Sequence, residues 1–154
     1  AEKINVRMSE CKIASGDVVL ETLGIGSCVA ICIYCSEKKM GGLAHAMLPY
    51  NTNRGITRFR FADEDVLYMV KRLKDEGCDP AKLVAKRIGG ASMFKGLSEH
   101  IGHDNVEAAR KKLGEQGVRI VAEEVFGTYG RCVWFDLNTG GVVVSKIYGA
   151  TIEI

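Results

Sequence analysis

Residues 28–34 have the sequence CVAICIY, an almost wholly apolar run that is rich in β-branched residues. Such a run is typical of a strand that is covered on both faces. The polar residues 36–39 supply a turn, and residues 42–48, GLAHAML, then return as a second apolar strand that stops before Pro49. The pattern predicts an antiparallel hairpin.

Other segments extend this hairpin into a layered fold. Helical spacing of apolar residues predicts a helix over residues 62–76, capped at Gly77, and a second helix that closes at Gly117. We interpret Asp104 and Glu107 as a variant capping box that opens the second helix. Strands are predicted at residues 18–23, 83–88, 118–125, 131–137 and 142–147. This order favours an α+β fold with layered mixed β-sheets and two main helices packed on one side.

The composition indicates a single globular unit. The chain has 154 residues, of which 47% are hydrophobic and 26% are charged, and it contains only two prolines. A domain of this size buries roughly 70% of the surface that its unfolded chain exposes. With no repeat and no linker-like stretch in the sequence, we expect residues 1–154 to form one domain.

The charge pattern gives little reason to expect nucleic acid or membrane as a partner. Twenty-one basic and 19 acidic residues leave a net charge of +2. The basic residues Arg54, Arg58 and Arg60 are followed at once by the acidic residues 63–65. Residues 1–7 are charged where a signal peptide needs an apolar run, and no stretch approaches the roughly 18 apolar residues of a membrane span. We therefore expect a soluble, cytoplasmic protein without membrane insertion.

Three cysteines have the C-x3-C-x2-C spacing that holds an iron–sulfur cluster in radical S-adenosylmethionine enzymes: Cys28, Cys32 and Cys35. In a strand, the first two side chains point to one face and the third to the other, so the thiolates cannot converge on a cluster. A zinc site is also weakly supported, because neither the pair Cys32 and Cys35 nor the pair His100 and His103 completes a set of four ligands. We expect no metal and no organic cofactor.

Cys28 also follows the segment GIGS at residues 24–27, and this gives it a second interpretation. A thiol just after two glycines is accessible, and the backbone N–H groups of Ser27 and Cys28 can turn toward an incoming carbonyl as an oxyanion hole. Cys28 is therefore a candidate nucleophile. The alternative is a buried cysteine at the start of a strand, with the glycines needed only for the turn.

His45 is the candidate base for this thiol, because the predicted hairpin brings its strand beside that of Cys28. The two side chains face the same side if the numbers of paired residues sum to an odd value such as 73 or 75, and opposite sides if the sum is even. Thr22 is placed to orient the imidazole through its hydroxyl. The alternatives are a core histidine bonded to a backbone carbonyl, and a threonine that is simply a good strand residue.

The sequence resembles the CheD family of chemoreceptor glutamine deamidases over most of its length. The resemblance is carried by four blocks: LGIGSCVA at 23–30, GLAHAMLP at 42–49, IGGASMF at 88–94 and IGHDNV at 101–106. It implies a catalytic triad of Cys28, His45 and Thr22 and a fold related to bacterial toxin deamidases of the cytotoxic necrotizing type. Asp104 departs from the arginine expected in the fourth block, and its role as a helix cap would account for this change.

The resemblance also implies a function and partners. The expected reaction converts glutamine side chains of chemoreceptor cytoplasmic domains to glutamate, and the same site could hydrolyse a glutamate methyl ester. The phosphatase CheC is the expected regulatory partner. A competing interpretation is a regulatory binding module for CheC and receptors that has little catalytic activity.

Overall fold

The structure is a computed structural model that describes residues 1–50, 61–93 and 100–154. Its strands, in chain order, are β1 (Glu2–Asn5), β2 (Cys11–Ser15), β3 (Val18–Ile25), β4 (Val29–Cys35), β5 (Met40–Ala46), β6 (Val84–Gly89), β7 (Arg119–Val125), β8 (Arg131–Asp136), β9 (Val142–Lys146) and β10 (Thr151–Glu153). The helices are α1 (Ala62–Asp75) and α2 (Ile101–Glu115), with a short 3-10 helix η2 (Pro80–Lys82) between α1 and β6.

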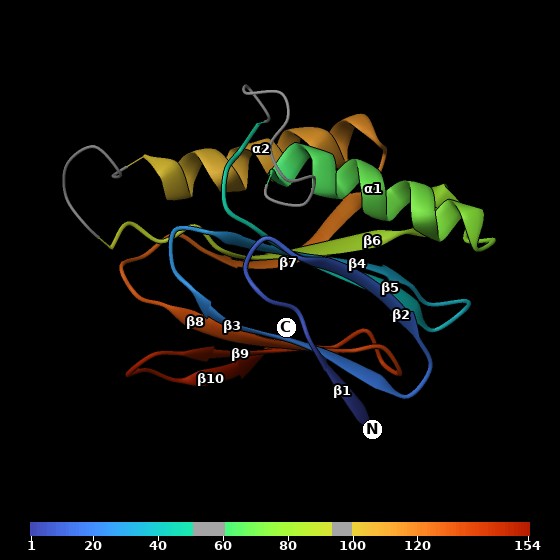
Figure 1. The fold of residues 1–154 in the computed structure, drawn as a ribbon, viewed down its shortest axis with the longest axis horizontal. Coiled ribbons are helices and arrows are strands. Elements are labelled where there is room, and N and C mark those ends of the chain that lie inside the picture. The colour runs from blue at the N-terminus through green and yellow to red at the C-terminus, as the bar shows by residue number, and fades with distance from the viewer. Residues whose placement is uncertain (51–60, 94–99) are drawn as a thin grey trace.

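These elements form three layers (Figure 1). One five-stranded sheet has the order β1-β3-β8-β9-β10, and the other has the order β2-β5-β4-β6-β7. The two sheets lie face to face, and both helices cover the outer face of the second sheet. Each sheet includes a parallel pair, β1 with β3 and β6 with β7, beside antiparallel pairs. The predicted α+β fold, with mixed sheets and two helices on one side, is confirmed.

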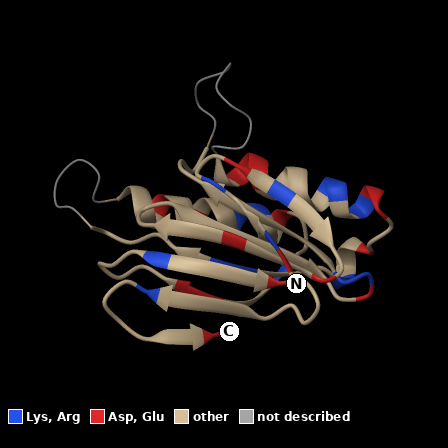
Figure 2. Ribbon diagram, turned by 60° about the horizontal axis from the view of Figure 1, so that its bottom comes forward, with Lys and Arg blue, Asp and Glu red and all other residues tan. Residues whose placement is uncertain are grey.

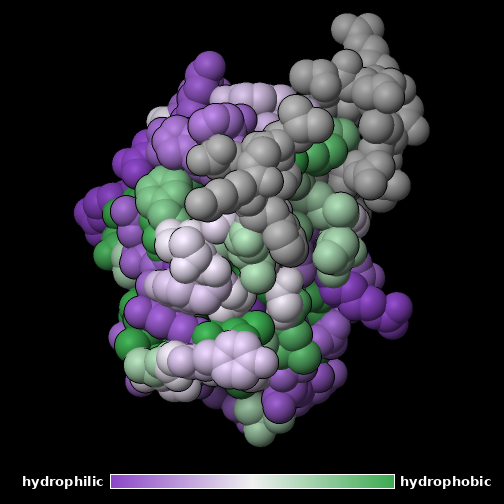
Figure 3. Space-filling model, turned by 90° about the vertical axis from the view of Figure 1, so that its left-hand side faces the viewer, coloured by the Kyte–Doolittle hydropathy of each residue, from purple (hydrophilic) through white to green (hydrophobic). Residues whose placement is uncertain are grey.

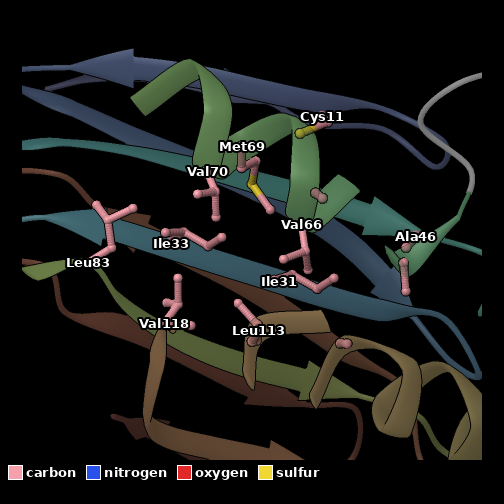
Figure 4. Close-up of a cluster of buried hydrophobic side chains, with 14 of the residues drawn as sticks. Cys11, Ile31, Ile33, Ala46, Val66, Met69, Val70, Leu83, Leu113 and Val118 are labelled. Atoms are coloured by element: carbon pink, nitrogen blue, oxygen red, sulfur yellow. The ribbon is translucent and has the colours of Figure 1, made fainter. Parts of the chain in front are cut away.

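The predicted hairpin forms the middle of the second sheet, where β4 pairs antiparallel with both β5 and β6. All seven residues of β4 are buried, because side chains of one face pack under the helices while those of the other face meet the first sheet. Ile31 and Ile33 lie in the core beneath the helices, as Figure 4 shows for the cluster around Val66 and Leu113. Burying each such side chain contributes about 1.5–3 kcal/mol.

The first helix, α1, matches its predicted range closely. Val66, Met69 and Leu73 form the buried stripe that the helical spacing predicts. Acidic residues occupy the first turn of this helix, where they favour its positive dipole end. Gly77 has φ +97°, the left-handed conformation that commonly ends a helix.

The predicted capping box of α2 is wrong. The helix begins at Ile101, so Asp104 already lies in the first turn, and its backbone N–H donates to the carbonyl of His100 at 2.9 Å. The earlier start has a tertiary cause, because Gly102 packs directly on the backbone of Gly90, where a Cβ would approach within 2.6 Å. Asp104 is exposed, and within the described residues its side chain makes no capping hydrogen bond, so its presence is not explained as a helix cap.

Strands β1, β2 and β10 were not predicted from the sequence, and each is a short strand at the edge of a sheet. The predicted polar loop at residues 51–60 lies outside the described residues. Charges of both signs are interspersed over the helices and the sheets, in keeping with the small net charge (Figure 2). Among the described residues, no helix is long and apolar enough to cross a membrane.

Candidate active site

Cys28 stands at the end of a tight connection between the two sheets. Strand β3 has a bulge between Thr22 and Ile25, and Gly24 in this bulge has φ +69°, which a side chain would strain. Cys28 is 9% exposed and directly precedes β4. Burial raises the pKa of its thiol, and the backbone N–H of Cys28 itself lowers that pKa in part. The thiol therefore needs a base to become a nucleophile at neutral pH.

The register of the hairpin places His45 on the same side as Cys28. Val29 pairs with Ala46 and Ala30 pairs with His45, so the paired numbers sum to 75, one of the odd values expected for a common face. Continuing this register makes Cys28 and His45 diagonal neighbours, a relation that spans about 7–8 Å and lies within reach of a long side chain. The sequence could not determine this register, and the structure resolves it.

The environment of His45 favours a neutral imidazole. The side chain is 1% exposed, and burial lowers its pKa to about 4. Its Nε2 is buried and has no hydrogen-bond partner in the part of the chain that the structure describes. The lone pair of Nε2 is thus available for a proton if Nδ1 carries the hydrogen.

Thr22 supplies the partner for Nδ1. Its Oγ1 lies 2.8 Å from His45 Nδ1, and the threonine is fully buried. Thr22 belongs to β3 of the first sheet and His45 to β5 of the second, so this hydrogen bond joins the two sheets across their common core. With Nδ1–H donating to Thr22, the imidazole is fixed in the tautomer that leaves Nε2 free to accept a proton.

The carbonyl oxygens of the loop before β4 each accept a hydrogen bond from another segment of the chain. The N–H of Ala91 donates to Gly26 O at 3.0 Å, and the N–H of Gly90 donates to Cys28 O at 2.8 Å. Asn105 Nδ2 donates to Ser27 O at 2.9 Å. All three carbonyls of residues 26–28 are therefore bound by the segment after β6 and by α2.

Sequence reasoning missed Asn105 and Met93 as parts of this site. In the sequence, Asn105 is a polar residue within the block IGHDNV at 101–106, which carries the family resemblance, and no local pattern marked it as part of the site. Met93 is 45% exposed, and its Sδ lies 2.8 Å from the position that a Cβ on Gly26 would take. Through this contact Met93 adjoins the candidate nucleophile loop. On the face of the molecule that Figure 3 shows, apolar side chains lie among polar ones. The hydrophobic character of residues 91–94 was the available signal.

The remaining candidate ligands do not come together. Cys28 and Cys32 face the core between the sheets, whereas Cys35 faces the core under the helices, as the strand interpretation predicts. Burial raises the pKa of Cys32 to about 12. His100 and His103 are exposed, and His103 lies in α2, stacked on a phenylalanine ring. Among residues 1–50, 61–93 and 100–154, no group of three or more potential ligands could hold a metal ion.

The fold and the site together define a layered α+β protein in which one end of a β-sandwich holds a thiol, an imidazole and a hydroxyl. The crystal structure of the hypothetical protein YfiH from Bacillus licheniformis has a similar fold, with a TM-score of 0.54 and 15% identity over 76% of this chain and 51% of that chain. Residues 47–146 match the family described as CheD chemotactic sensory transduction.

Curated relatives cover nearly the whole chain. A probable chemoreceptor glutamine deamidase CheD 2 from Geobacter metallireducens is 45% identical, over 94% of this chain and 93% of its own length. A probable chemoreceptor glutamine deamidase CheD from Desulforamulus reducens is 40% identical, over 99% and 95%. The chemoreceptor glutamine deamidase CheD from Thermotoga maritima is 37% identical, over 94% and 92%. The chain belongs to the CheD family.

Proposed function

We propose that this chain is a cysteine-dependent protein-glutamine deamidase that converts chemoreceptor glutamine side chains to glutamate and ammonia in chemotaxis adaptation. Membership of the CheD family and the names of its relatives support the reaction. One observation carries the assignment of residues. The buried imidazole of His45 is bonded through Nδ1 to Thr22 and lies on the same face as Cys28, and its Nε2 has no hydrogen-bond partner among the described residues.

In the first half of the reaction, His45 Nε2 takes the thiol proton of Cys28, and the thiolate attacks the carboxamide carbon of the substrate glutamine. The C=O π pair moves onto oxygen, and the backbone N–H groups of Ser27 and Cys28 would hold this oxyanion. When the tetrahedral intermediate collapses, the C–N bond breaks and the protonated imidazole gives its proton to the departing ammonia. A thioester on Cys28 remains. A hydrogen bond between a nucleophile and its base, here the Cys28 thiol and His45 Nε2, commonly tightens only when substrate is bound.

In the second half, His45 removes a proton from water, and the hydroxide attacks the thioester carbon. The C–S bond breaks, the sulfur recovers a proton from the imidazole, and the substrate leaves with a carboxylate in place of its carboxamide. Because the thioester has lost its original leaving group, we propose that the site also hydrolyses glutamate methyl esters, with methanol leaving in the first half. This scheme uses no metal and no organic cofactor.

The surroundings of the site support a macromolecular substrate. Leu23, next to Thr22, is 49% exposed, and Met93 beside Gly26 is 45% exposed. Leu23 points to the opposite face of β3 from Thr22, so Met93 is the apolar side chain on which we propose that a receptor segment rests while its glutamine enters. As the family resemblance implies, we also propose CheC as a regulatory partner and the cytoplasm as the location.

The test is peptide mass spectrometry of a chemoreceptor cytoplasmic fragment incubated with the protein and, in parallel, with Cys28→Ala. Conversion of specific glutamines to glutamates by the parent alone is expected. If the parent binds the receptor or CheC but converts nothing, the chain acts as a binding module instead. Conversion by both proteins would mean that the nucleophile is another residue.

A further inference from the structure

Asn105 is a fully buried polar residue that joins the two strands of the candidate active site. Its Nδ2 donates to Ser27 O at 2.9 Å and to Met47 O at 3.0 Å. The ladder between β4 and β5 ends at the pair Val29 and Ala46, so one side-chain amide bridges the two chains just beyond their last backbone pair. Two carbonyl acceptors on one side of the amide require its nitrogen there, which fixes its orientation.

The close packing of α2 sets this position. Gly102 lies one turn before Asn105 on the same helix face, and a Cβ on Gly102 would come within 2.5 Å of Ala91 O. The helix can approach the segment after β6 only because both Gly90 and Gly102 lack side chains. This contact brings the amide of Asn105 within hydrogen-bonding distance of the loop before β4.

The hydrogen bond to Ser27 O has a consequence on the other side of the same peptide group. In a trans peptide, C=O and N–H point in opposite directions, so a Ser27 carbonyl that faces α2 turns the N–H of Cys28 away from it. Likewise, Gly26 O accepts a hydrogen bond from the N–H of Ala91, so the N–H of Ser27 in the same peptide group points away from Ala91. Among the described residues, neither N–H is paired with a backbone acceptor, and the N–H of Cys28 acts on its own thiol.

We propose that Asn105 is a positioning residue, which holds the Ser27–Cys28 peptide group so that its N–H faces the oxyanion. This inference rests on the proposed function and adds the residue that orients its oxyanion donor. Loss of one oxyanion donor lowers kcat by about 10²–10³-fold. Because Asn105 acts through a peptide group that Ala91 and Gly90 still restrain, we expect a smaller loss, about 10–100-fold.

The test compares Asn105→Asp, which keeps the size of the side chain but removes its N–H donors, with Leu113→Ala. Leu113 is a buried residue on the same helix whose side chain packs in the core under the second sheet, so its truncation destabilises α2 without removing a contact to the loop. Deamidation of a receptor fragment gives kcat and KM, and the alkylation rate of Cys28 by iodoacetamide is followed by peptide mass spectrometry. Both are measured well below the melting temperature of each variant.

We expect Asn105→Asp to lower kcat by about 10–100-fold with KM within about twofold, while alkylation of Cys28 stays within about threefold, because displacement of iodide develops no oxyanion. Leu113→Ala should keep kcat. If Asn105→Asp does not fold, Asn105→Ser, whose hydroxyl stands one bond closer to the backbone than Nδ2 and so does not reach Ser27 O, should show the same separation of kcat from alkylation.

An unchanged kcat in the Asn105 variants, or a parallel fall of kcat and alkylation, would overturn the inference. Parent protein and Cys28→Ala are assayed alongside. A parent without activity refutes the proposed function, whereas an active parent together with a fully active Asn105 variant refutes only the positioning role.

Discussion

Replacing Thr22 by valine tests the link between the two sheets at the candidate active site. Valine has nearly the shape of threonine but puts a methyl group where the hydroxyl stands. The change removes the 2.8 Å hydrogen bond to His45 Nδ1 and leaves that nitrogen buried without a partner. If His45 is the base, Thr22→Val should lower kcat far more than KM, because the imidazole loses its orientation and its fixed tautomer.

The size of the effect follows from the burial of both residues. Leaving a buried donor unsatisfied costs about 1–3 kcal/mol. If most of that cost falls on the orientation that the transition state requires, and each 1.36 kcal/mol is tenfold in rate, kcat should fall by about 10–100-fold. The free energy of unfolding should fall by a comparable amount, about 1–3 kcal/mol.

Thr22→Ser is the matched control, because it keeps the hydroxyl and loses only a methyl group. The assay is initial-rate deamidation of a receptor fragment by mass spectrometry, together with urea unfolding of each variant. Serine should retain activity within a few-fold of the parent. Equal activity of the valine variant and the parent, or equal impairment by valine and serine, would show that the hydroxyl does not orient the base.

Three further predictions concern pH and packing. Burial lowers the pKa of His45 to about 4 and raises the pKa of the Cys28 thiol, so kcat/KM should be flat from about pH 5.5 to 8.5. A bell-shaped pH profile of kcat/KM inside that range would contradict a neutral thiol–imidazole pair. Burial and two acidic neighbours raise the pKa of Asp65 to about 9, so the folded state keeps a proton that the unfolded state releases above about pH 4. The free energy of unfolding should therefore fall as pH rises from about 4 to 9. Urea unfolding of Asp65→Asn at a series of pH values should lack this pH dependence. Gly89→Ala should destabilise the protein by about 1–3 kcal/mol, since its Cβ would lie 2.5 Å from Cys28 O. A Cβ on Gly114 meets no atom of the described residues within 4 Å, so Gly114→Ala should raise the melting temperature slightly.

The features that were predictable from the sequence are those with local causes. The apolar run of β4, the polar turn after it and the return strand of β5 made the hairpin evident, and helical spacing with a terminal glycine located α1. The alternation of side chains along β4 also gave the correct faces for Cys32 and Cys35. These inferences need only the period of a strand or helix and the conformational preferences of turn residues.

The features that escaped prediction depend on contacts between distant segments. The register of the hairpin decides whether Cys28 and His45 share a face, and sequence parity allowed both answers. The bond from Thr22 to His45 connects separate sheets, so local patterns left it as one of two alternatives, and only the family resemblance favoured it. The N-cap of α2 is His100, four residues before the expected Asp104, because a glycine contact to a neighbouring segment outweighed a local capping signal.

The short edge strands were missed for a different physical reason. β1 and β10 are three or four residues long and carry charged residues at their ends or centres, so they lack an apolar pattern of their own. Edge strands of this kind are held by a neighbour and are kept polar, which limits unwanted pairing with other chains. Their conformation is imposed by β3 and β9, which they border.

The position of β4 has a consequence for the timescale on which the candidate nucleophile can move. This strand separates the two cores and is hydrogen-bonded on both edges, so its amide protons should exchange with solvent only when the whole domain unfolds. Cys28 is joined covalently to the first residue of that strand. The thiol is therefore anchored to the segment that opens last, and large displacements of its backbone should be as rare as global unfolding, while the exposed side chains around it remain free to adjust within nanoseconds.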